Sequence, residues 1–388
     1  MQPVLLNWGA NNLSGWGLVG LNLLFQWAND PDLLPLMGAS IGENDLLATD
    51  PLRGAACRTA ILRSNGFQSE LQRIPKGARL SFPVVVALGN GLVGPNTVLG
   101  KSTIARCIFE NTHLAHLDDI LARYDFLLCA SHWNAELLKA NCSKRVEILF
   151  EGIDPSLFHP GPKSGLLDPS RFYIFSGGKV EYRKGHDLTL MAFREFSRRH
   201  PEAVLVTLWH SPWPQFANGF QGRLDTALTL NANGAIDAPR WLAANGIDPA
   251  NVIELPQTPN PLMPQVLRDM DCALQPSRAE ACTNLLAKEA MASGVPVILA
   301  ANTGVKDLID GGNCVALTRQ TPIRDHAAGG TEGWGESDVE EILDALEKLY
   351  TDTMLRRTIG QEGAEWLLRN ERTWHDHARK MKALLLAQ

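Results

Sequence analysis

The sequence predicts an α/β protein made of two halves, each a parallel sheet covered by helices. Short apolar runs alternate along the chain with segments of helical period, and this alternation is typical of parallel sheets with helices on both faces. In the middle, residues 154–170 hold four prolines and two glycines without an apolar period, which is a linker composition. We therefore expect domains at 1–160 and 161–365, and a C-terminal helix at 366–388 that crosses back toward the first domain.

The expected elements follow from these patterns, since short apolar runs predict strands and a three-to-four-residue apolar period predicts helices. In the first half, strands are expected at Val4–Trp8, Phe82–Leu88, Phe126–Ala130 and Val146–Phe150, and helices at Leu18–Ala28, Leu114–Arg123 and Asn134–Asn141. In the second half, strands are expected at Phe172–Ser176, Ala203–Leu208, Asn251–Leu255, Cys272–Gln275, Val295–Leu299 and Cys314–Leu317, and helices at His186–Arg199, Asn284–Ser293, Val339–Leu349 and Glu362–Leu386.

The start of the chain is free of charge as far as Asp30. A signal peptide needs a basic beginning, which is missing here. A transmembrane helix needs about 20 mostly apolar residues, whereas asparagines, glycines, a serine and a glutamine interrupt this run. We interpret the segment as an interior strand, a loop and a buried helix.

Composition limits the classes of function. The 388 residues are 45% hydrophobic, enough for a sizeable core in two domains. Lys and Arg number 36 against 42 Asp and Glu, and this lack of basic excess argues against bulk nucleic acid as the main partner. Seven scattered cysteines without a CxxC pair indicate reduced thiols and a cytoplasmic protein.

One candidate site follows the expected strand Cys272–Gln275. A polar loop comes next, in which Thr283 or Asn284 can cap a helix. A helix N-terminus at the carboxyl end of a parallel strand favours phosphate, because its N–H groups and dipole point at the ligand. Glu289, on the second turn of that helix, cannot help to bind a diphosphate but can accept hydrogen bonds from sugar hydroxyls. Taken alone, it is more simply read as a solvated helix residue.

A second candidate site follows the expected strand Phe172–Ser176. A turn containing Gly178 precedes two basic positions, Lys179 and Lys184, with Arg183 beside the second. Lysines held at a strand's carboxyl end can neutralise a pyrophosphate, since opposite charges about 4 Å apart attract by about 4 kcal/mol at an effective dielectric of about 20. An ordinary basic turn is the alternative interpretation.

Together the two stretches resemble the retaining nucleotide-sugar glycosyltransferases of the GT-B type, family 4 (glycosyl transferases group 1). In that family a basic residue shortly after a glycine, and a Lys-Gly before a helix, bind the donor diphosphate. The resemblance gives these roles to Lys179 and Lys184. The segment EAMASGVPVI, which begins at Glu289, matches the family's second glutamate, so the resemblance makes Glu289 the ribose-binding acid. The similarity is strong over about 130–310 and weak over 30–100.

The first glutamate of the family departs from the pattern. Eight residues separate Glu280 from Glu289 where the family has seven, so that Ala281 occupies the expected position. Either the loop is one residue longer, or Glu280 is not the acid that contacts the donor sugar. The loop is expected to present backbone N–H groups to the phosphate and the sugar. Its candidate contacts are Cys282, Thr283, Asn284 and Leu285.

The segment Gly15–Gly20 (GWGLVG) fits G-x-G-x-x-G. Six residues separate it from the preceding strand, which is too loose for a dinucleotide-binding turn. We expect a glycine loop instead, in which Gly15 and Gly17 let a donor or acceptor approach the backbone.

The sequence gives little indication of a metal site or of a catalytic histidine. Asp269 and Asp271 form a D-x-D that we interpret as chance loop acids. His375 and His377 are two apart and point to different helix faces. His113 follows an expected strand end and is a candidate sugar contact, although a lone histidine is more often structural.

The resemblance implies a GT-B fold, with two Rossmann-like domains facing each other across a cleft. The first domain would bind the acceptor, and the second a nucleotide-diphospho-sugar of UDP or GDP type as co-substrate, with no cofactor and no metal. The reaction would be glycosyl transfer with retention, with the leaving diphosphate stabilised by Lys179, Lys184 and a helix N-terminus. The acceptor is left open among glycans, lipid-linked groups and proteins, as is a peripheral contact with a membrane. Alternatives are a GT-B sugar-nucleotide epimerase, a catalytically silent nucleotide-sugar-binding module and a nicotinamide-dependent oxidoreductase.

Overall fold

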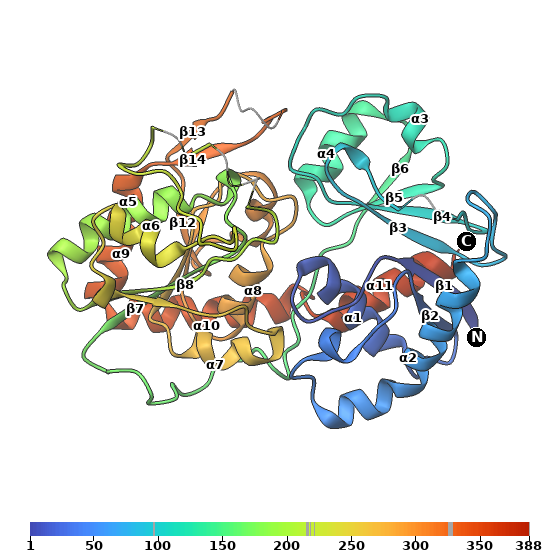
Figure 1. Cartoon of the computed structure of the whole chain (residues 1–388), viewed down its shortest axis with the longest axis horizontal. Helices are drawn as coiled ribbons and strands as arrows, with labels where there is room; N and C mark the ends of the chain where they lie inside the picture. Colours follow the sequence, from blue (N-terminus) through green and yellow to red (C-terminus); the bar gives the residue numbers. More distant parts are fainter. Residues whose placement is uncertain (96–97, 215–216, 218, 221, 325–328, 388) are drawn as a thin grey trace. The chain divides into compact units, whose positions relative to one another are not determined.

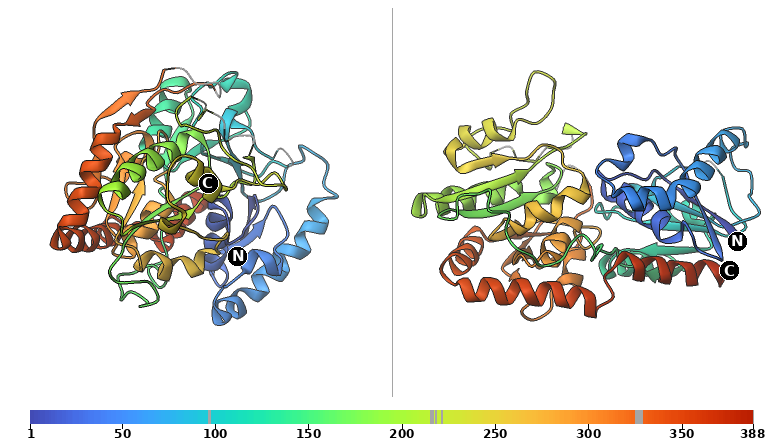
Figure 2. Two further views of the ribbon diagram at one scale, coloured as in Figure 1. Left: turned by 60° about the vertical axis from the view of Figure 1, so that its left-hand side comes forward. Right: turned by 90° about the horizontal axis from the view of Figure 1, so that it is seen from below.

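A computed structural model of the chain describes residues 1–95, 98–214, 217, 219–220, 222–324 and 329–387. It contains two compact units, which Figure 1 shows in sequence colours. The first unit comprises residues 1–154, 259–261 and 371–388, and the second unit residues 155–258 and 262–370. In each unit, helices cover both faces of a six-stranded parallel sheet (Figure 2).

The sheet of the first unit has the strand order β2-β1-β3-β4-β5-β6. Neighbouring strands are all parallel. The strands are β1 (Gln2–Asn7), β2 (Leu33–Met37), β3 (Val84–Leu88), β4 (Thr103–Cys107), β5 (Phe126–Cys129) and β6 (Arg145–Ile148). The helices are α1 (Gly15–Trp27), α2 (Pro51–Leu71), α3 (Leu117–Leu121), α4 (His132–Asn141) and α11 (Trp374–Leu386).

The sheet of the second unit has the order β12-β11-β10-β7-β8-β9. Its strands are β7 (Phe172–Gly177), β8 (Ala203–Leu208), β9 (Val252–Glu254), β10 (Cys272–Gln275), β11 (Val297–Ala300) and β12 (Val315–Leu317). Its helices are α5 (His186–Arg199), α6 (Ala238–Ala244), α7 (Met263–Arg268), α8 (Leu285–Ala292), α9 (Val339–Thr351) and α10 (Thr353–Arg369). An antiparallel pair, β13 (Gln320–Pro322) and β14 (Gly335–Ser337), lies outside this sheet. The strand order is that of a Rossmann fold, in which the direction of winding reverses between the first and fourth strands.

The central strands of both sheets are buried along their whole length. All five residues of β3 are buried, and so are all six of β7, as expected of parallel strands covered on both faces. Phe193 and Phe196 of α5 are fully buried in one core cluster with Ile342 and Leu346 of α9. The predicted α/β class and Rossmann-like architecture are therefore confirmed.

Several elements differ from the sequence-based expectation. Strands β2 and β4 and helix α2 were not expected, because β2 contains a proline, β4 contains a buried arginine and the buried face of α2 includes the polar residues Ser64 and Gln68. The expected single helix Glu362–Leu386 is two helices, α10 and α11. The chain breaks between them because Glu371 takes a positive φ of 52° and Thr373 caps α11, its side chain accepting the N–H of Asp376.

The prediction of a glycine loop at Gly15–Gly20 is also wrong, because these residues belong to helix α1. Ser14 caps α1 by accepting the N–H of Gly17 at 3.1 Å, so Gly15 and Gly17 lie in the first turn of a helix. Glycine is required at position 17, because a Cβ there would lie 2.3 Å from the Asn11 side chain. In the part of the chain that the structure describes, no helix combines the length and apolarity that crossing a membrane requires.

Candidate functional site

The candidate site lies where the winding of the second sheet reverses. β7 and β10 are parallel neighbours, but the chain leaves β7 for α5 and leaves β10 for α8. The two loops, residues 178–185 and 276–284, therefore begin at the same edge of the sheet. Ligands of open α/β sheets bind at this kind of edge, because the diverging loops leave room between them.

Gly185 holds the two loops together. It ends the short 3-10 turn Tyr182–Lys184 in a left-handed conformation (φ 70°). A Cβ at this position would lie 2.2 Å from the carbonyl oxygen of Pro276 in the other loop. Only glycine permits both the conformation and the close approach. The glycine of the Lys-Gly pair singled out in the sequence is therefore a packing requirement of the site.

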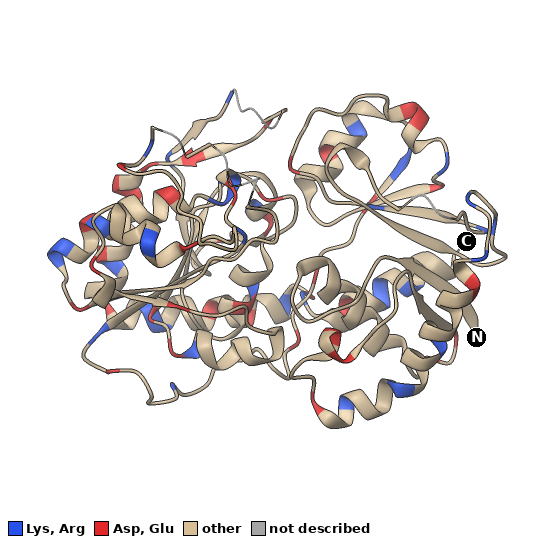
Figure 3. Cartoon of the chain, in the orientation of Figure 1, with Lys and Arg blue, Asp and Glu red and all other residues tan. Residues whose placement is uncertain are grey.

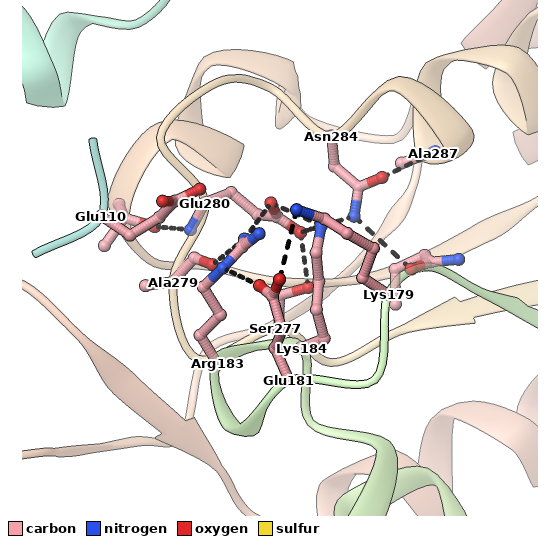
Figure 4. Close-up of polar contacts among 12 residues, drawn as sticks. Glu110, Lys179, Glu181, Arg183, Lys184, Ser277, Ala279, Glu280, Asn284 and Ala287 are labelled. Atoms are coloured by element: carbon pink, nitrogen blue, oxygen red, sulfur yellow. Dashed lines mark hydrogen bonds and ion pairs between the residues drawn. The ribbon is translucent and has the colours of Figure 1, made fainter. Parts of the chain in front are cut away.

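Glu280 is the centre of a buried ionic cluster in these loops. Its carboxylate lies 2.7 and 2.8 Å from the Lys184 ammonium and 3.1 Å from the Arg183 guanidinium. It also accepts hydrogen bonds from the Ser277 hydroxyl at 2.8 Å and from the Asn284 amide at 2.9 Å. Figure 4 shows these side chains converging on the carboxylate. Two cations and two neutral donors thus occupy the whole carboxylate.

A second carboxylate, that of Glu181, also contacts Arg183. Glu181 pairs with Arg183 at 2.7 Å and with Lys179 at 3.2 Å. Burial opposes its ionisation, but the charges of Arg183, Lys179 and Lys184 outweigh burial and lower its pKa to about 2. For Glu280, burial is again opposed, chiefly by Lys184 and Arg183, and its pKa is lowered too. Both carboxylates are therefore anionic at neutral pH. Burial lowers the pKa of Lys184, and the neighbouring charge of Glu280 opposes this effect.

Lys179 differs from its buried neighbours. Its side chain is 42% exposed, and its ammonium lies 4.9 Å from the centre of the Trp213 ring. Gly178, just before it, has a φ of 130° that side chains rarely adopt. Lys179 is therefore a solvent-accessible cation at the mouth of the cluster, whereas Lys184 and Arg183 form its interior.

The N-terminus of α8 faces this cluster. Asn284 caps the helix, its side-chain oxygen accepting the N–H of Ala287 at 3.2 Å while its amide donates to Glu280. It does so at a φ of 56°, a strained conformation of the kind found at ligand sites. Thr283 beside it is buried, and its hydroxyl has no hydrogen-bond partner among the described residues. An unsatisfied hydroxyl beside the first N–H groups of a helix fits a phosphate or sugar oxygen.

The other candidate residues predicted in this loop, Cys282 and Leu285, lie on either side of Thr283 and Asn284. Cys282 is half-buried and precedes Thr283, and Leu285 is the first residue of α8. Glu289 lies on the second turn of α8 and is buried rather than solvated. The solvated-residue interpretation of Glu289 is therefore wrong, and its ribose-binding role stays a prediction.

Sequence reasoning missed a second buried network that joins the two loops. Arg278 donates two hydrogen bonds to the Asp187 carboxylate, at 2.8 and 2.6 Å, and a third to Glu336 of β14 at 2.8 Å. Arg223 closes the ring by bonding Asp187 at 2.5 Å and Glu336 at 2.7 Å. Arg278 and Asp187 have no exposed side-chain surface. The proximity of Arg278 to Glu280 and of Asp187 to Lys184 in sequence was the one available signal.

Gly15, Gly17 and His113 belong to the first unit. His113 is exposed in the loop before α3, with its backbone N–H bonded to Asn111. The Trp16 ring, between the two glycines, packs 4.8 Å from the guanidinium carbon of Arg106, which pairs with Glu151 at 2.5 Å. These contacts stabilise the first turn of α1, and the ligand roles of the three candidates stay predictions.

The acids and histidines set aside in the sequence have structural partners. Asp269 accepts the Ser164 hydroxyl at 2.7 Å, and Asp271 accepts the N–H of Tyr173 at 2.9 Å. His377 is bonded to the carbonyl of Phe150 at 2.8 Å. Among the described residues, no three His, Cys, Asp or Glu side chains group in a way that could hold a metal ion.

Comparison with known proteins agrees with this geometry. Residues 171–352, which contain both loops, match the family model described as glycosyl transferases group 1. A curated relative, the D-inositol 3-phosphate glycosyltransferase of Stackebrandtia nassauensis, is 29% identical over 259 residues. That alignment takes in 63% of this chain and 50% of the relative, so the chain spans about half the length of this relative.

Solved structures resemble the whole chain in fold. Sucrose-phosphate synthase from Thermosynechococcus elongatus superposes with a TM-score of 0.64 at 16% identity, covering 99% of this chain and 98% of that one. HepE from Anabaena, in complex with UDP-glucose, superposes with a TM-score of 0.63 at 11% identity and full coverage of both chains. The chain therefore has the GT-B fold that its motifs predict. The match to the group 1 family model lies within its second unit.

Proposed function

We propose that the chain transfers a sugar from a nucleotide-diphospho-sugar to an acceptor hydroxyl, with retention at the anomeric carbon and without a metal ion. The observation that carries this proposal is the pair of buried cations, Lys184 and Arg183, held beside the N-terminus of α8. Such an arrangement suits a group whose negative charge grows as it leaves. The group 1 domain that contains it supports the same reaction class.

In this proposal Glu280 holds the two cations in place before the donor binds. The diphosphate then shares Lys184 and Arg183 with Glu280, while Lys179 reaches it from the solvent side. Thr283 and the first N–H groups of α8 donate further hydrogen bonds to phosphate or sugar oxygens. Because these donors are oriented by the fold, they need little reorganisation when charge develops on the leaving oxygen.

The donor nucleotide is proposed to be a UDP or GDP type. HepE, a similar fold, is described in complex with UDP-glucose, which favours testing uridine donors first. The curated relative is named for D-inositol 3-phosphate, so phosphorylated polyols belong among the acceptors to test. Glycans, lipid-linked groups and proteins remain candidates beside them.

The first experiment is a thermal-shift panel of nucleoside diphosphates and nucleotide sugars. A ligand present at about 100 times its dissociation constant stabilises the folded state by about 2.7 kcal/mol, so the correct donor class should raise the melting temperature clearly. Transfer is then followed by NMR of the anomeric proton, with and without EDTA. An inverted product, or loss of activity in EDTA, would contradict the retaining or the metal-free part of the proposal.

A silent nucleotide-sugar-binding module is the second candidate, and the engaged state of Glu280 favours it. A carboxylate bound by Lys184, Arg183, Ser277 and Asn284 has little capacity left for a donor sugar. Tight donor binding with neither transfer nor hydrolysis, over a broad acceptor panel, would support this candidate over the enzyme.

A further inference from the structure

The two buried cations of the candidate site are already balanced by two carboxylates. Lys184 pairs with Glu280 at 2.7 Å, and Arg183 pairs with Glu280 at 3.1 Å and with Glu181 at 2.7 Å. Each of these four side chains is at most 14% exposed. Figure 3 shows basic and acidic residues mixed in the loops of the second unit. The interior of the cluster therefore has no excess positive charge to offer an incoming anion.

The groups nearest to this cluster add little net charge. Lys179 is a further cation, but its side chain is 42% exposed and it pairs with Glu181 at 3.2 Å. His186, the first residue of α5, stays uncharged at neutral pH, because burial and the charge of Lys184 lower its pKa to about 3. Lys179 is thus the one cation that these neighbours contribute.

The other elements packed against the two loops carry charges in equal numbers. The ring described above contains two arginines and two carboxylates. Helix α8 carries one charge of each sign, and so does the turn η7 (Thr303–Leu308), which bonds the backbone of Glu280. The charged residues of α8 and η7 are Lys288, Glu289, Lys306 and Asp307. The site thus offers a ligand little more than the charge of Lys179 and the N-terminus of α8.

A nucleotide-diphospho-sugar brings two ionised phosphates into this site. Lys179 and the helix N-terminus, which is equivalent to about half a positive charge, leave part of that negative charge uncompensated. A desolvated site tolerates excess charge poorly, and an ionisable group within it changes its protonation state instead. Binding of the donor therefore calls for either a further cation or a proton.

Glu280 is the carboxylate best placed to accept a proton. It is the less exposed of the two, at 6% against 14% for Glu181. Burial is the strongest influence on its pKa and raises it, whereas the charges of Lys184 and Arg183 hold the pKa below its usual value. A diphosphate that engages the same two cations opposes their effect on Glu280, and burial then favours the neutral acid.

We propose that the protein takes up a proton when the nucleotide sugar binds, and that Glu280 receives it. The inference rests on the proposed function, because it requires a diphosphate beside Lys184 and Arg183. Solvent supplies the proton, which adds to a carboxylate oxygen of Glu280, and no bond of the donor changes in this step. The neutral acid then leaves both cations to the diphosphate, so Glu280 serves as a positioning residue for the leaving group.

The test is isothermal titration calorimetry of the full chain with UDP-glucose, or with GDP-glucose if the thermal-shift panel selects guanosine donors. A terminal phosphate titrates at a pKa of about 6, but a nucleotide sugar has none, so any proton exchanged belongs to the protein. Titrations at one pH in PIPES and in imidazole differ by the ionisation heat of the buffer multiplied by the number of protons taken up. We expect uptake of between about half a proton and one proton at a pH of about 6.5.

The affinity for the donor should also fall as the pH rises, because the complex holds a proton that the free protein lacks. For uptake of one proton, the dissociation constant increases about tenfold per pH unit. A site that exchanges no proton shows a flat profile instead.

Glutamine variants assign the proton to one carboxylate. Glu280→Gln should abolish the uptake, because the amide resembles the neutral acid in size but does not titrate, and its affinity at a pH of about 8 should equal or exceed that of the unaltered protein. Glu181→Gln should retain the uptake, and Glu136→Gln, at an exposed position of α4, is the matched control. Thermal melts check that each variant folds. If Glu280→Gln does not fold, uptake by the unaltered protein and its persistence in Glu181→Gln carry the test.

Each failure has a distinct meaning. Binding of the nucleotide sugar without proton uptake overturns this inference and leaves the proposed function standing, whereas the absence of any binding contradicts the proposed function and this inference with it. Uptake that persists in Glu280→Gln, or that disappears in Glu181→Gln, overturns the role of Glu280. Magnesium chloride is the last check: if it strengthens binding and removes the uptake, a metal ion rather than a proton balances the donor, and the inference is wrong.

Discussion

Lys184 shows how one side chain can serve both the structure and the proposed chemistry. Its ammonium is buried against both oxygens of Glu280, so it already neutralises an anion before any donor is present. A diphosphate offers the same ammonium more negative charge in the same desolvated place. The residue that stabilises the empty site is thus the one expected to stabilise the leaving group.

We expect Lys184→Ala to lower kcat/KM by about 10²–10³, which corresponds to a loss of about 2–4 kcal/mol of transition-state stabilisation. Lys179→Ala is the comparison, and its effect should be smaller because Lys179 is largely solvated. Steady-state kinetics with the donor identified by the thermal-shift panel provide the measurement. Turnover close to normal in the Lys184 variant would remove the diphosphate assignment.

Glu289 is buried on α8, and its proposed partner is the donor ribose. Glu289→Ala should weaken the binding of the nucleoside diphosphate about tenfold or more, since a hydrogen bond to a charged group contributes about 1.5–3 kcal/mol. Calorimetry with the ribo- and 2′-deoxyribonucleotides makes the test specific. The unaltered protein should prefer the ribonucleotide, and the variant should lose that preference. Equal affinities throughout would reject the role.

Glu181 makes a prediction about pH. Its pKa in the folded protein is about 2, below the usual 4.5. The unfolded state therefore takes up the proton first as the pH falls. Its contribution of about 3 kcal/mol is present above pH of about 4.5 and is lost as the pH falls toward about 2.

Urea unfolding at pH values between about 6 and about 3 measures this loss. Glu181→Gln should flatten the dependence of the unfolding free energy on pH relative to the unaltered protein. Glu136→Gln, at an exposed position of α4, is the control and should leave the slope unchanged. An unchanged slope in both variants would contradict the ionic account of Glu181.

At the scale of elements, the site depends on two loops that are joined twice. The Glu280 cluster joins them near the ligand edge, and the ring of Arg278, Asp187, Arg223 and Glu336 joins them deeper in the unit. The ring also takes in β14 and the segment before α6, where Glu336 and Arg223 lie. The loop that carries Glu280 is thus held by contacts with the other loop, with the start of α5 and with β14.

Breaking this ring should be costly. Arg278→Met leaves Asp187 without its bidentate partner in the interior, and we expect a loss of about 3–5 kcal/mol in unfolding free energy. The double variant R278M/D187L should lose less than the sum of its single changes, because no uncompensated charge remains. Additive losses in denaturant unfolding would contradict a coupled network, and Arg198→Met serves as a surface control.

At the scale of the whole molecule, the chain returns to its first unit at the C-terminus. Residues 371–388 belong to that unit. The N–H of Trp374 bonds the carbonyl of Ile153, and Lys382 bonds both carboxylate oxygens of Asp30 at 2.8 Å. Trp374, Met381 and Leu385 of α11 are buried. The first unit is therefore built from both ends of the sequence.

A chain that stops after Asn370 should have a destabilised first unit. Burial of the three large apolar side chains of α11 contributes at most about 5–8 kcal/mol, and its loss also exposes the face of α1 against which α11 packs. Limited proteolysis should then cut within 1–154 before it cuts within 171–352. A control that lacks the last residue alone should behave like the full chain. Equal protease resistance of both units would contradict this dependence.

The sequence predicts well the two strands and two helices that carry the site. Short apolar runs mark β7 and β10, an amphipathic period marks α5, and the Asn284 cap marks the start of α8; these signals act within a few residues of the chain. Predictions fail where local pattern and tertiary use differ. The buried face of α2 includes Ser64 and Gln68, so no apolar period marks the helix in the sequence. The glycines of GWGLVG lie in a helix because Ser14 caps it, and a side chain at position 17 would clash with Asn11.

For the candidate site too, some features follow from the local sequence and others only from the tertiary structure. The sequence alone determined that Lys179, Lys184 and Glu289 follow parallel strands at the edge where anions bind, because strand ends and helix starts are local features. Only the tertiary structure decided that Glu280 lies against Lys184 and that Arg278 lies against Asp187, contacts between residues more than ninety positions apart. Ion pairs of this kind require two loops to meet at a fixed distance, and that distance depends on the packing of the whole sheet beneath them.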